Sequence, residues 1–371
     1  MKILSFVLVL LGPFLCRASL FTSPVGHREA FLGNAGSALV CSSGSAIYNP
    51  AGIGFCSHDV SISLSGTGIS YQELDGTVFS RNTGSLKSTT LLTSAIFSIE
   101  DDLHMGLYYS YPVNWIDYFR VNDSTTSYTQ EIQRQAAIAG ISYGGMLTNN
   151  FAWGFSIGMS WSEMNSGLVS NTESAGTAST FTQRVMQEEN YIVLNPGLLW
   201  KANDAYSLGF TVQWRAINLY SEADVYTSSL STGQTTISEV FQRYTPHAQP
   251  LLGLTLGQVL NFGSQQLLFD WTHAPQYSLP STQQQVSDDI KYDAVSLGWQ
   301  MHILENADLL LGGNYSQYGE LKNYLTSIGF AFKKRTYEAS LGLYKQTSKN
   351  DAYGGQNSDT MGFLYSSTLS Y

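Results

Sequence analysis

Large apolar residues alternate with small ones along several segments of this 371-residue chain. Over residues 151–162, Phe, Trp, Phe, Ile, Met and Trp fill the odd positions, and Ala, Gly and Ser fill the even ones. The same alternation returns over residues 206–216 and 361–371. Successive side chains of a β-strand point to opposite faces of a sheet, so this period of two predicts strands with one apolar face.

Two details favour a transmembrane β-barrel over a soluble β-sandwich, whose strands also alternate. The apolar face ends in Trp or Tyr at one or both ends of these segments, as the aromatic girdles of membrane barrels do. The other face carries Ser, Gly, Thr and Gln, where a soluble domain would place charges. Charged residues make up 12% of the chain, against about 25% in an ordinary soluble domain. The net charge of −10 argues against a nucleic-acid partner.

We predict fourteen strands, an even number as in single-chain bacterial barrels. They span residues 58–71, 88–100, 102–113, 128–145, 149–163, 185–201, 204–221, 240–257, 264–275, 289–304, 307–316, 322–333, 335–347 and 359–371. Short turns such as 100–102 alternate with long polar loops such as 114–127, 164–184 and 222–239. The predicted fold class is therefore all-β, a transmembrane antiparallel barrel over residues 58–371, with its turns and both termini on the periplasmic side.

Both ends of the chain carry features of export to an outer membrane. Residues 1–18 have the basic start, the apolar stretch and, at Ala18, the small residue of a signal peptide. The stretch is too short for a membrane anchor, and the bulky Leu15 disfavours a lipoprotein signal at Cys16. The terminal Tyr371, on the apolar face, resembles the signal read by the barrel-assembly machinery. We expect the mature protein in the outer membrane of a Gram-negative bacterium.

Two cysteines, Cys41 and Cys56, remain after the predicted cleavage. In an oxidising compartment they are candidates for a disulfide, and two buried thiols are the alternative. No CxxC pair or zinc-type Cys/His spacing occurs, and the six histidines are scattered. We therefore predict no metal site and no cofactor.

Residues 19–57 do not alternate and are rich in Gly, Ala and Ser. Such a segment is too small to form a core of its own. A barrel of fourteen strands is too wide to be filled by its own side chains. We therefore predict that residues 19–57 form a plug in the lumen, with a periplasmic tail as the alternative.

Two prolines fall in or near predicted strands. Pro196 lies inside one strand, between Asn195 and Gly197, and Pro112 lies near the end of the third. Proline removes a donor from the strand ladder, so each is a candidate kink that could open a gap in the wall. The alternative is that each proline bends a loop at the end of a strand.

A Gly/Ala-rich segment that ends in Asn-Pro-Ala-Gly just before the first strand resembles the FadL-type outer-membrane transporters of long-chain fatty acids and other hydrophobic molecules. The matching residues are Gly33, Ala35, Gly36, Ala38, Ser45, Ala46, Asn49, Pro50, Ala51 and Gly52. The resemblance implies passive uptake, an N-terminal hatch and sideways release into outer-membrane lipid through a gap near Pro112 or Pro196. The residues it assigns to the hatch and to substrate binding are Asn49, Pro50, Ala51, Gly52, Ile53 and Phe55.

The carboxylate of a fatty acid would need a cation, and Arg134 and Arg215 are the candidates. Arg215 lies on the small-residue face of its strand and is therefore expected inside the lumen. Alternatively, Arg215 pairs with a lumen acid such as Asp270 or Glu338 and only stabilises the barrel.

Three other functions compete with uptake. A PorV-like branch of the same superfamily serves protein secretion, and its members would bind a protein partner. A general porin needs a charged constriction, which these inward faces lack. A barrel enzyme needs a Ser and a His on one wall, and no histidine stands at a distinctive place. We therefore predict a channel and no enzyme.

Overall fold

The computed structural model describes residues 24–75, 82–83, 91–122, 126–174, 177–232, 237–244, 252–277, 290–318, 321–350 and 356–371. The predicted signal peptide, residues 1–18, lies outside this set. Within it, none of the helices combines the length and the apolar character needed to cross a membrane.

The described chain is mostly strand, as its alternation predicts. The helical turns are η2 (Glu29–Leu32), α2 (Ser45–Tyr48) and η3 (Pro50–Phe55). The strands are β1 (Val60–Asp75), β2 (Asn82–Thr83), β3 (Leu91–Glu100), β4 (Leu103–Asn122), β5 (Thr126–Thr148), β6 (Phe151–Ser174), β7 (Thr177–Asn203), β8 (Tyr206–Ser231), β9 (Ser238–Tyr244), β10 (Leu252–Phe262), β11 (Gln265–Tyr277), β12 (Ile290–Leu304), β13 (Ala307–Tyr318), β14 (Leu321–Lys334), β15 (Tyr337–Asn350) and β16 (Gln356–Ser370).

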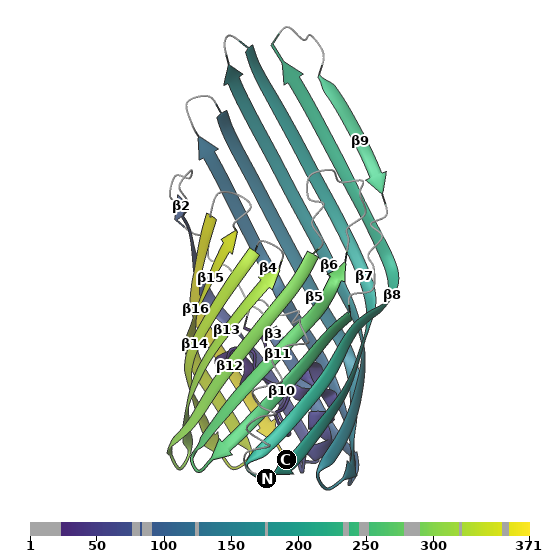
Figure 1. Cartoon of the computed structure of the whole chain (residues 1–371), viewed down its shortest axis with the longest axis vertical. Coiled ribbons are helices and arrows are strands. Elements are labelled where there is room, and N and C mark those ends of the chain that lie inside the picture. The colour runs from purple at the N-terminus through teal and green to yellow at the C-terminus, as the bar shows by residue number, and fades with distance from the viewer. Residues whose placement is uncertain are drawn as a thin grey trace.

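Fourteen of these strands close into one antiparallel barrel (Figure 1). Each pairs with the next along the chain, except that β1 pairs with β3 and β8 pairs with β10. Strand β16 pairs with β1 and closes the ring. Two short strands stand outside the ring: β2 pairs with β1, and β9 pairs with the far half of β8. The predicted fourteen-stranded transmembrane barrel is confirmed.

Two-residue turns join the strands at one end of the barrel, which we call the turn end. They lie at residues 101–102, 149–150, 204–205, 263–264, 305–306 and 335–336. The first strand begins and the last strand ends here, because Val60 and Tyr371 exchange backbone hydrogen bonds of 3.2 and 2.8 Å. The predicted placement of the short turns and both strand termini on one side is therefore confirmed.

The long polar loops predicted at 114–127, 164–184 and 222–239 are wrong, because β4 to β8 continue as paired strands through most of these residues. Together with β9 they form a sheet that rises beyond the barrel and that we call the extension (Figure 1). It comprises residues 113–122, 126–136, 162–174, 177–189, 221–231 and 238–244. A sheet outside lipid needs no apolar face, so its polar composition resembles that of loops.

The strand predicted at 240–257 is wrong for a related reason. It divides into β9, which pairs with the extension part of β8, and β10, which pairs with the barrel part of the same strand. Residues 245–251 between them contain two prolines and lie outside the described set. Proline cannot donate to a strand ladder, so an interruption at this place follows from the sequence.

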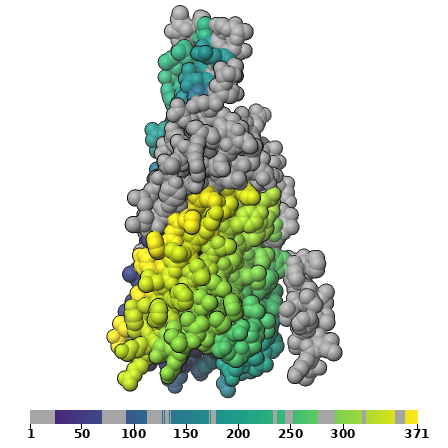
Figure 2. Space-filling view, turned by 90° about the vertical axis from the view of Figure 1, so that its left-hand side faces the viewer, coloured from purple at the N-terminus to yellow at the C-terminus, as the bar shows by residue number. Residues whose placement is uncertain are grey.

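The outer face of the barrel carries large apolar side chains, and small side chains are frequent on the inner face. On β6, Phe155, Ile157 and Met159 expose 37%, 45% and 46% of their surface, whereas Ser156 between them is buried. Figure 2 shows the outer wall formed by the C-terminal strands, with the extension rising above it. The apolar outer wall fits contact with lipid, as the alternation predicts.

Candidate functional site

Residues 24–59, which we call the N-terminal segment, lie against the inner wall of the barrel (Figure 1). Phe31, Leu32 and Ala51 are fully buried in one apolar cluster with inward-facing wall residues. The wall residues of that cluster are Ala152, Leu199, Val259, Leu268, Leu310, Leu325, Ala331, Tyr344 and Leu364. The segment therefore uses the barrel wall as its core.

Glycines on three neighbouring strands let Asn49, Pro50 and Ala51, the NPA turn, approach the wall closely. Gly144 of β5 pairs with Gly154 of β6, which pairs with Gly197 of β7. An added Cβ would lie 2.3 Å from the Pro50 carbonyl oxygen at Gly144, 2.1 Å from the Ala51 nitrogen at Gly154, and 2.1 Å from Asn49 Oδ1 at Gly197. Only glycine leaves room for the turn at this height of the barrel.

Replacing Gly154 by Val is therefore expected to push the NPA turn off the wall. The new Cβ would meet backbone atoms, which cannot move aside as a flexible side chain can. We expect Gly154→Val to cost about 1–3 kcal/mol of the free energy of unfolding in detergent and to raise ion conductance in planar bilayers. Gly167→Val on the same strand is the matched control, because nothing lies within 4 Å of its added Cβ. Equal behaviour of the two variants would contradict the close packing.

Asn49 holds the NPA turn in place with hydrogen bonds in two directions. Its Nδ2 donates to the carbonyls of Ser37 at 2.7 Å and Leu198 of β7 at 3.1 Å. Its Oδ1 accepts the backbone N–H of Ala51 at 3.2 Å, which caps η3. The other predicted hatch residues follow in η3, where Ile53 is buried against Ile96 of the wall and Phe55 is half-buried.

Small polar side chains of the wall satisfy the carbonyl groups of the N-terminal segment. The hydroxyl of Ser142 donates to Ala46 at 2.6 Å, and Asn195 Nδ2 donates to Ile47 at 2.9 Å. Further donors are Ser94 to Ser43 (2.8 Å), Ser207 to Ala38 (2.9 Å) and Ser327 to Phe31 (2.9 Å). The uncharged inner face of the barrel therefore has two roles. Its glycines leave room for the N-terminal segment, and its small polar side chains donate hydrogen bonds to the backbone of that segment.

Glu29 is a site residue that sequence reasoning missed. It is fully buried in the N-terminal segment, and its side chain lies against Gly26, Gly36 and Gly44. Its carboxylate accepts the N–H of His27 at 2.9 Å and the hydroxyl of Ser42. Burial raises the pKa of Glu29, while these hydrogen bonds oppose that shift. Glu29 thus contacts three parts of the N-terminal segment, around Gly26, Gly36 and Gly44, and stabilises their arrangement.

Acidic wall residues of β11 and β15 also anchor the N-terminal segment. Asp270 of β11 accepts the backbone N–H groups of Gly36 and Ser37, both at 2.8 Å. Glu338 of β15 forms a two-pronged ion pair with Arg28. Asp270 and Glu338 were the predicted alternative partners of Arg215, and among the described residues they bind the segment instead.

Arg215 of β8 lies on the inner face, as predicted. Its guanidinium stands 5.4 Å from the centre of the Tyr191 ring of β7. Within the described residues, its buried Nε and the buried Tyr191 hydroxyl have no hydrogen-bond partner. The other candidate cation, Arg134, lies in the extension opposite Trp115 and Met164, and its side chain is outside the described set.

An apolar lining stands beside Arg215 and Tyr191. It joins α2 of the N-terminal segment to four wall strands, and its members are Val25, Ala46, Ile47, Tyr48, Leu92, Tyr108, Ile138, Tyr191 and Val193. All of these side chains are buried and pack in one cluster next to the Arg215 guanidinium. The described residues contain no group of three or more His, Cys, Asp or Glu side chains that could hold a metal.

The seam between β7 and β8 is irregular around Pro196. The register shifts between Asn190 and Tyr191 and again between Ile192 and Val193. Backbone pairing with β8 then omits Asn195 and Pro196, although both still pair with β6. A side-chain hydrogen bond from Thr211 of β8 to Asn195 Oδ1 bridges the omitted positions.

The surroundings of Pro112 differ. The register between β4 and β5 shifts between Ser110 and Val113, which is the mark of a bulge around Pro112. The last pair of β3 with β4 is Leu92 with Ser110, so Pro112 stands where β4 leaves the ring for the extension. Its side chain lies outside the described set. Among the residues that the structure describes, Pro196 is the candidate kink with a strand on both sides.

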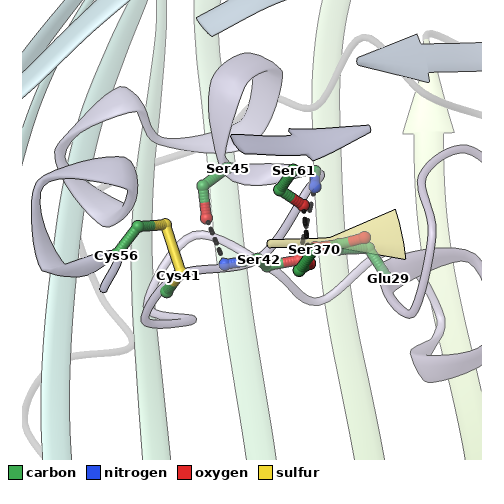
Figure 3. Close-up of a disulfide and its surroundings, with 8 residues drawn as sticks. Glu29, Cys41, Ser42, Ser45, Cys56, Ser61 and Ser370 are labelled. Carbon is green, nitrogen blue, oxygen red and sulfur yellow. Dashed lines mark hydrogen bonds between the residues drawn. A yellow bond between two sulfur atoms is a disulfide. The ribbon is translucent and has the colours of Figure 1, made fainter. Parts of the chain in front are cut away.

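The structure joins Cys41 and Cys56 in a disulfide, with 4.7 Å between their Cα atoms (Figure 3). The bridge lies near Ser61 of β1 and Ser370 of β16, whose hydroxyls are 3.0 Å apart at the turn end. It closes the part of the N-terminal segment that carries α2, the NPA turn and η3.

A fourteen-stranded barrel with an N-terminal segment against its inner wall has the fold of the FadL-type outer-membrane transporters. Similar solved structures include the toluene transporter TodX of P. putida (TM-score 0.67, 13% identity, 94% of this chain and 98% of that chain). The toluene transporter TbuX of Ralstonia pickettii is also similar (0.67, 12%, 94% and 99%). A FadL homologue of Pseudomonas aeruginosa is similar too (0.64, 13%, 95% and 99%).

Comparison of structures finds similar proteins, whereas comparison of sequences finds none. No known family profile matches the chain, and no curated protein matches it. At 12–13% identity, the likeness to these transporters shows the shared fold.

Proposed function

We propose that this protein is an outer-membrane channel for passive uptake of hydrophobic molecules, including long-chain fatty acids. One observation carries the proposal: the N-terminal segment packs against the inner wall and, together with wall strands, forms the apolar lining beside Arg215. Neighbours of the same fold include two toluene transporters, which supports a hydrophobic substrate. The bilayer lipid receives the substrate, and the barrel-assembly machinery inserts the protein.

In this proposal, residues 19–57 act as the hatch that closes the lumen to water and small ions. The substrate enters from the extension side and binds at the apolar lining. Each CH₂ group that leaves water there gains about 0.8 kcal/mol, so no energy source is required. Arg215 faces the polar head of a fatty acid, because its Nε lacks a partner in the described residues.

The substrate then leaves sideways between β7 and β8. The seam has lost backbone pairing at Asn195 and Pro196, so separating the strands there breaks fewer hydrogen bonds. Asn195 also bonds α2, and Asn49 bonds Leu198 on the same strand. A shift of the NPA turn is thereby transmitted to the wall beside the seam.

Expression in a bacterial strain that lacks its own fatty-acid transporter tests this function. We expect uptake of a labelled long-chain fatty acid to be restored, because the apolar lining and the seam provide a route that bypasses the outer leaflet. Surface assembly is checked by protease accessibility of the extension on whole cells. No uptake of fatty acid or toluene despite correct assembly would contradict the proposal and favour the PorV-like accessory role.

A further inference from the structure

The Cys41–Cys56 disulfide confines the NPA turn within a covalent loop. The two cysteines are 15 positions apart, and the residues between them include α2, the NPA turn and all of η3. The N–H of Cys41 donates to the Gly52 carbonyl, and the N–H of Cys56 donates to the Ile53 carbonyl, both at 3.0 Å. The bridge therefore fastens the chain just after the NPA turn to the chain that precedes α2.

Apart from the bridge, this loop is held by the buried apolar side chains of Ile47, Ala51 and Ile53, which pack against the wall, and by hydrogen bonds to backbone carbonyls. These hydrogen bonds come from Ser94, Ser142 and Asn195 of the wall, and from Asn49 within the loop. Water can replace such bonds, so each contributes little to the net stability. The disulfide is the covalent contact among these, and it adds to the apolar packing.

A soluble reductant can reach the bridge from its Cys41 side, whereas Cys56 is buried. Cys41 is half-buried, and its neighbour Val40 exposes 36% of its surface. On the other side of the bridge, residues 57–59 are exposed. Figure 3 shows the bridge together with Ser61 and Ser370. These two serines lie next to Val60 and Tyr371, where the first strand begins and the last strand ends, at the turn end. That end faces the periplasm under the proposed function.

We propose that the Cys41–Cys56 disulfide is a redox-sensitive latch on the hatch. A dithiol protein reduces the bridge by two electrons: one of its thiolates attacks a cysteine sulfur, its second thiol resolves the mixed disulfide, and two free cysteine thiols and an oxidised dithiol result. Reduction frees residues 42–55 to leave the wall together with the NPA turn. The latch rests on the proposed function in so far as the hatch gates the substrate.

Conductance of the full-length protein in planar bilayers tests the latch. Dithiothreitol is added at the turn-end side, and free thiols are counted by maleimide labelling. Loss of a 15-residue loop closure shifts such equilibria about 100-fold, so the open fraction should rise by roughly 10- to 100-fold after reduction. Unchanged conductance with both thiols free would overturn the proposal, and so would a bridge that resists the dithiol in the folded barrel.

The double variant Cys41→Ser/Cys56→Ser is the matched control. It should conduct like the reduced wild type and should not respond to dithiothreitol. A change in its conductance on adding dithiothreitol would show that the reductant acts at a place other than the Cys41–Cys56 bridge, which would contradict the latch. Ion conductance separates the latch from the uptake proposal. If reduction opens the channel but no hydrophobic compound is taken up in either state, the latch stands and the proposed function fails.

Discussion

Deletion of residues 19–57 is expected to turn a closed barrel into an open pore. The fourteen strands close through pairing of β1 with β16, which does not involve the N-terminal segment. The inner wall that the segment covers carries many glycines and serines beside its apolar residues, so its own side chains do not fill a lumen of this width. Barrels of this width leave an aqueous channel when they are not plugged, so we expect roughly a tenfold or larger rise in single-channel conductance.

Planar bilayer recordings of the refolded deletion variant measure this effect. Folding is verified by the altered gel mobility of the unheated barrel, and Gly167→Val serves as a folded control that should stay closed. A folded deletion variant with the closed conductance of the intact protein would show that residues 19–57 do not plug the lumen.

The barrel could be predicted from the sequence because lipid imposes a strict pattern on it. A strand in the bilayer must show apolar side chains on every second residue, and residues 151–162 do so without exception. The short turns could be predicted as well, since they interrupt this pattern for only a few residues. Outside the bilayer a strand does not need an apolar side chain at every second residue. The sequence of the extension therefore resembles that of polar loops.

The contacts inside the barrel could be predicted only in part. The Asn-Pro-Ala sequence predicts a role for Asn49 in the hatch, but nothing in the sequence places Asn49 against Leu198 or Gly197. Glu29 and Asp270 bind backbone N–H groups, and a partner of that kind has no sequence signature. Their roles depend on how the N-terminal segment folds back into the barrel, which is a matter of tertiary structure.

Cross-linking the β7–β8 seam is expected to stop uptake. Leu194 of β7 and Trp214 of β8 are direct partners, next to Asn195 and Pro196, which do not pair with β8. A disulfide between cysteines at positions 194 and 214 would join the two strands covalently there. Cys41 and Cys56 are already joined, and the third cysteine, Cys16, lies in the predicted signal peptide, so no native thiol of the mature protein competes. If the substrate leaves sideways through this seam, closing it covalently blocks the route while the barrel and the hatch remain intact.

The matched control is a cross-link between Ile328 and Leu343, which are direct partners on β14 and β15, away from the seam. The decisive measurement is uptake of a labelled long-chain fatty acid by cells that produce each fully oxidised double-cysteine variant. We predict that Leu194→Cys/Trp214→Cys takes up no more than cells without the protein, while Ile328→Cys/Leu343→Cys matches the wild type. Wild-type uptake through a fully cross-linked β7–β8 seam would contradict sideways release at Pro196.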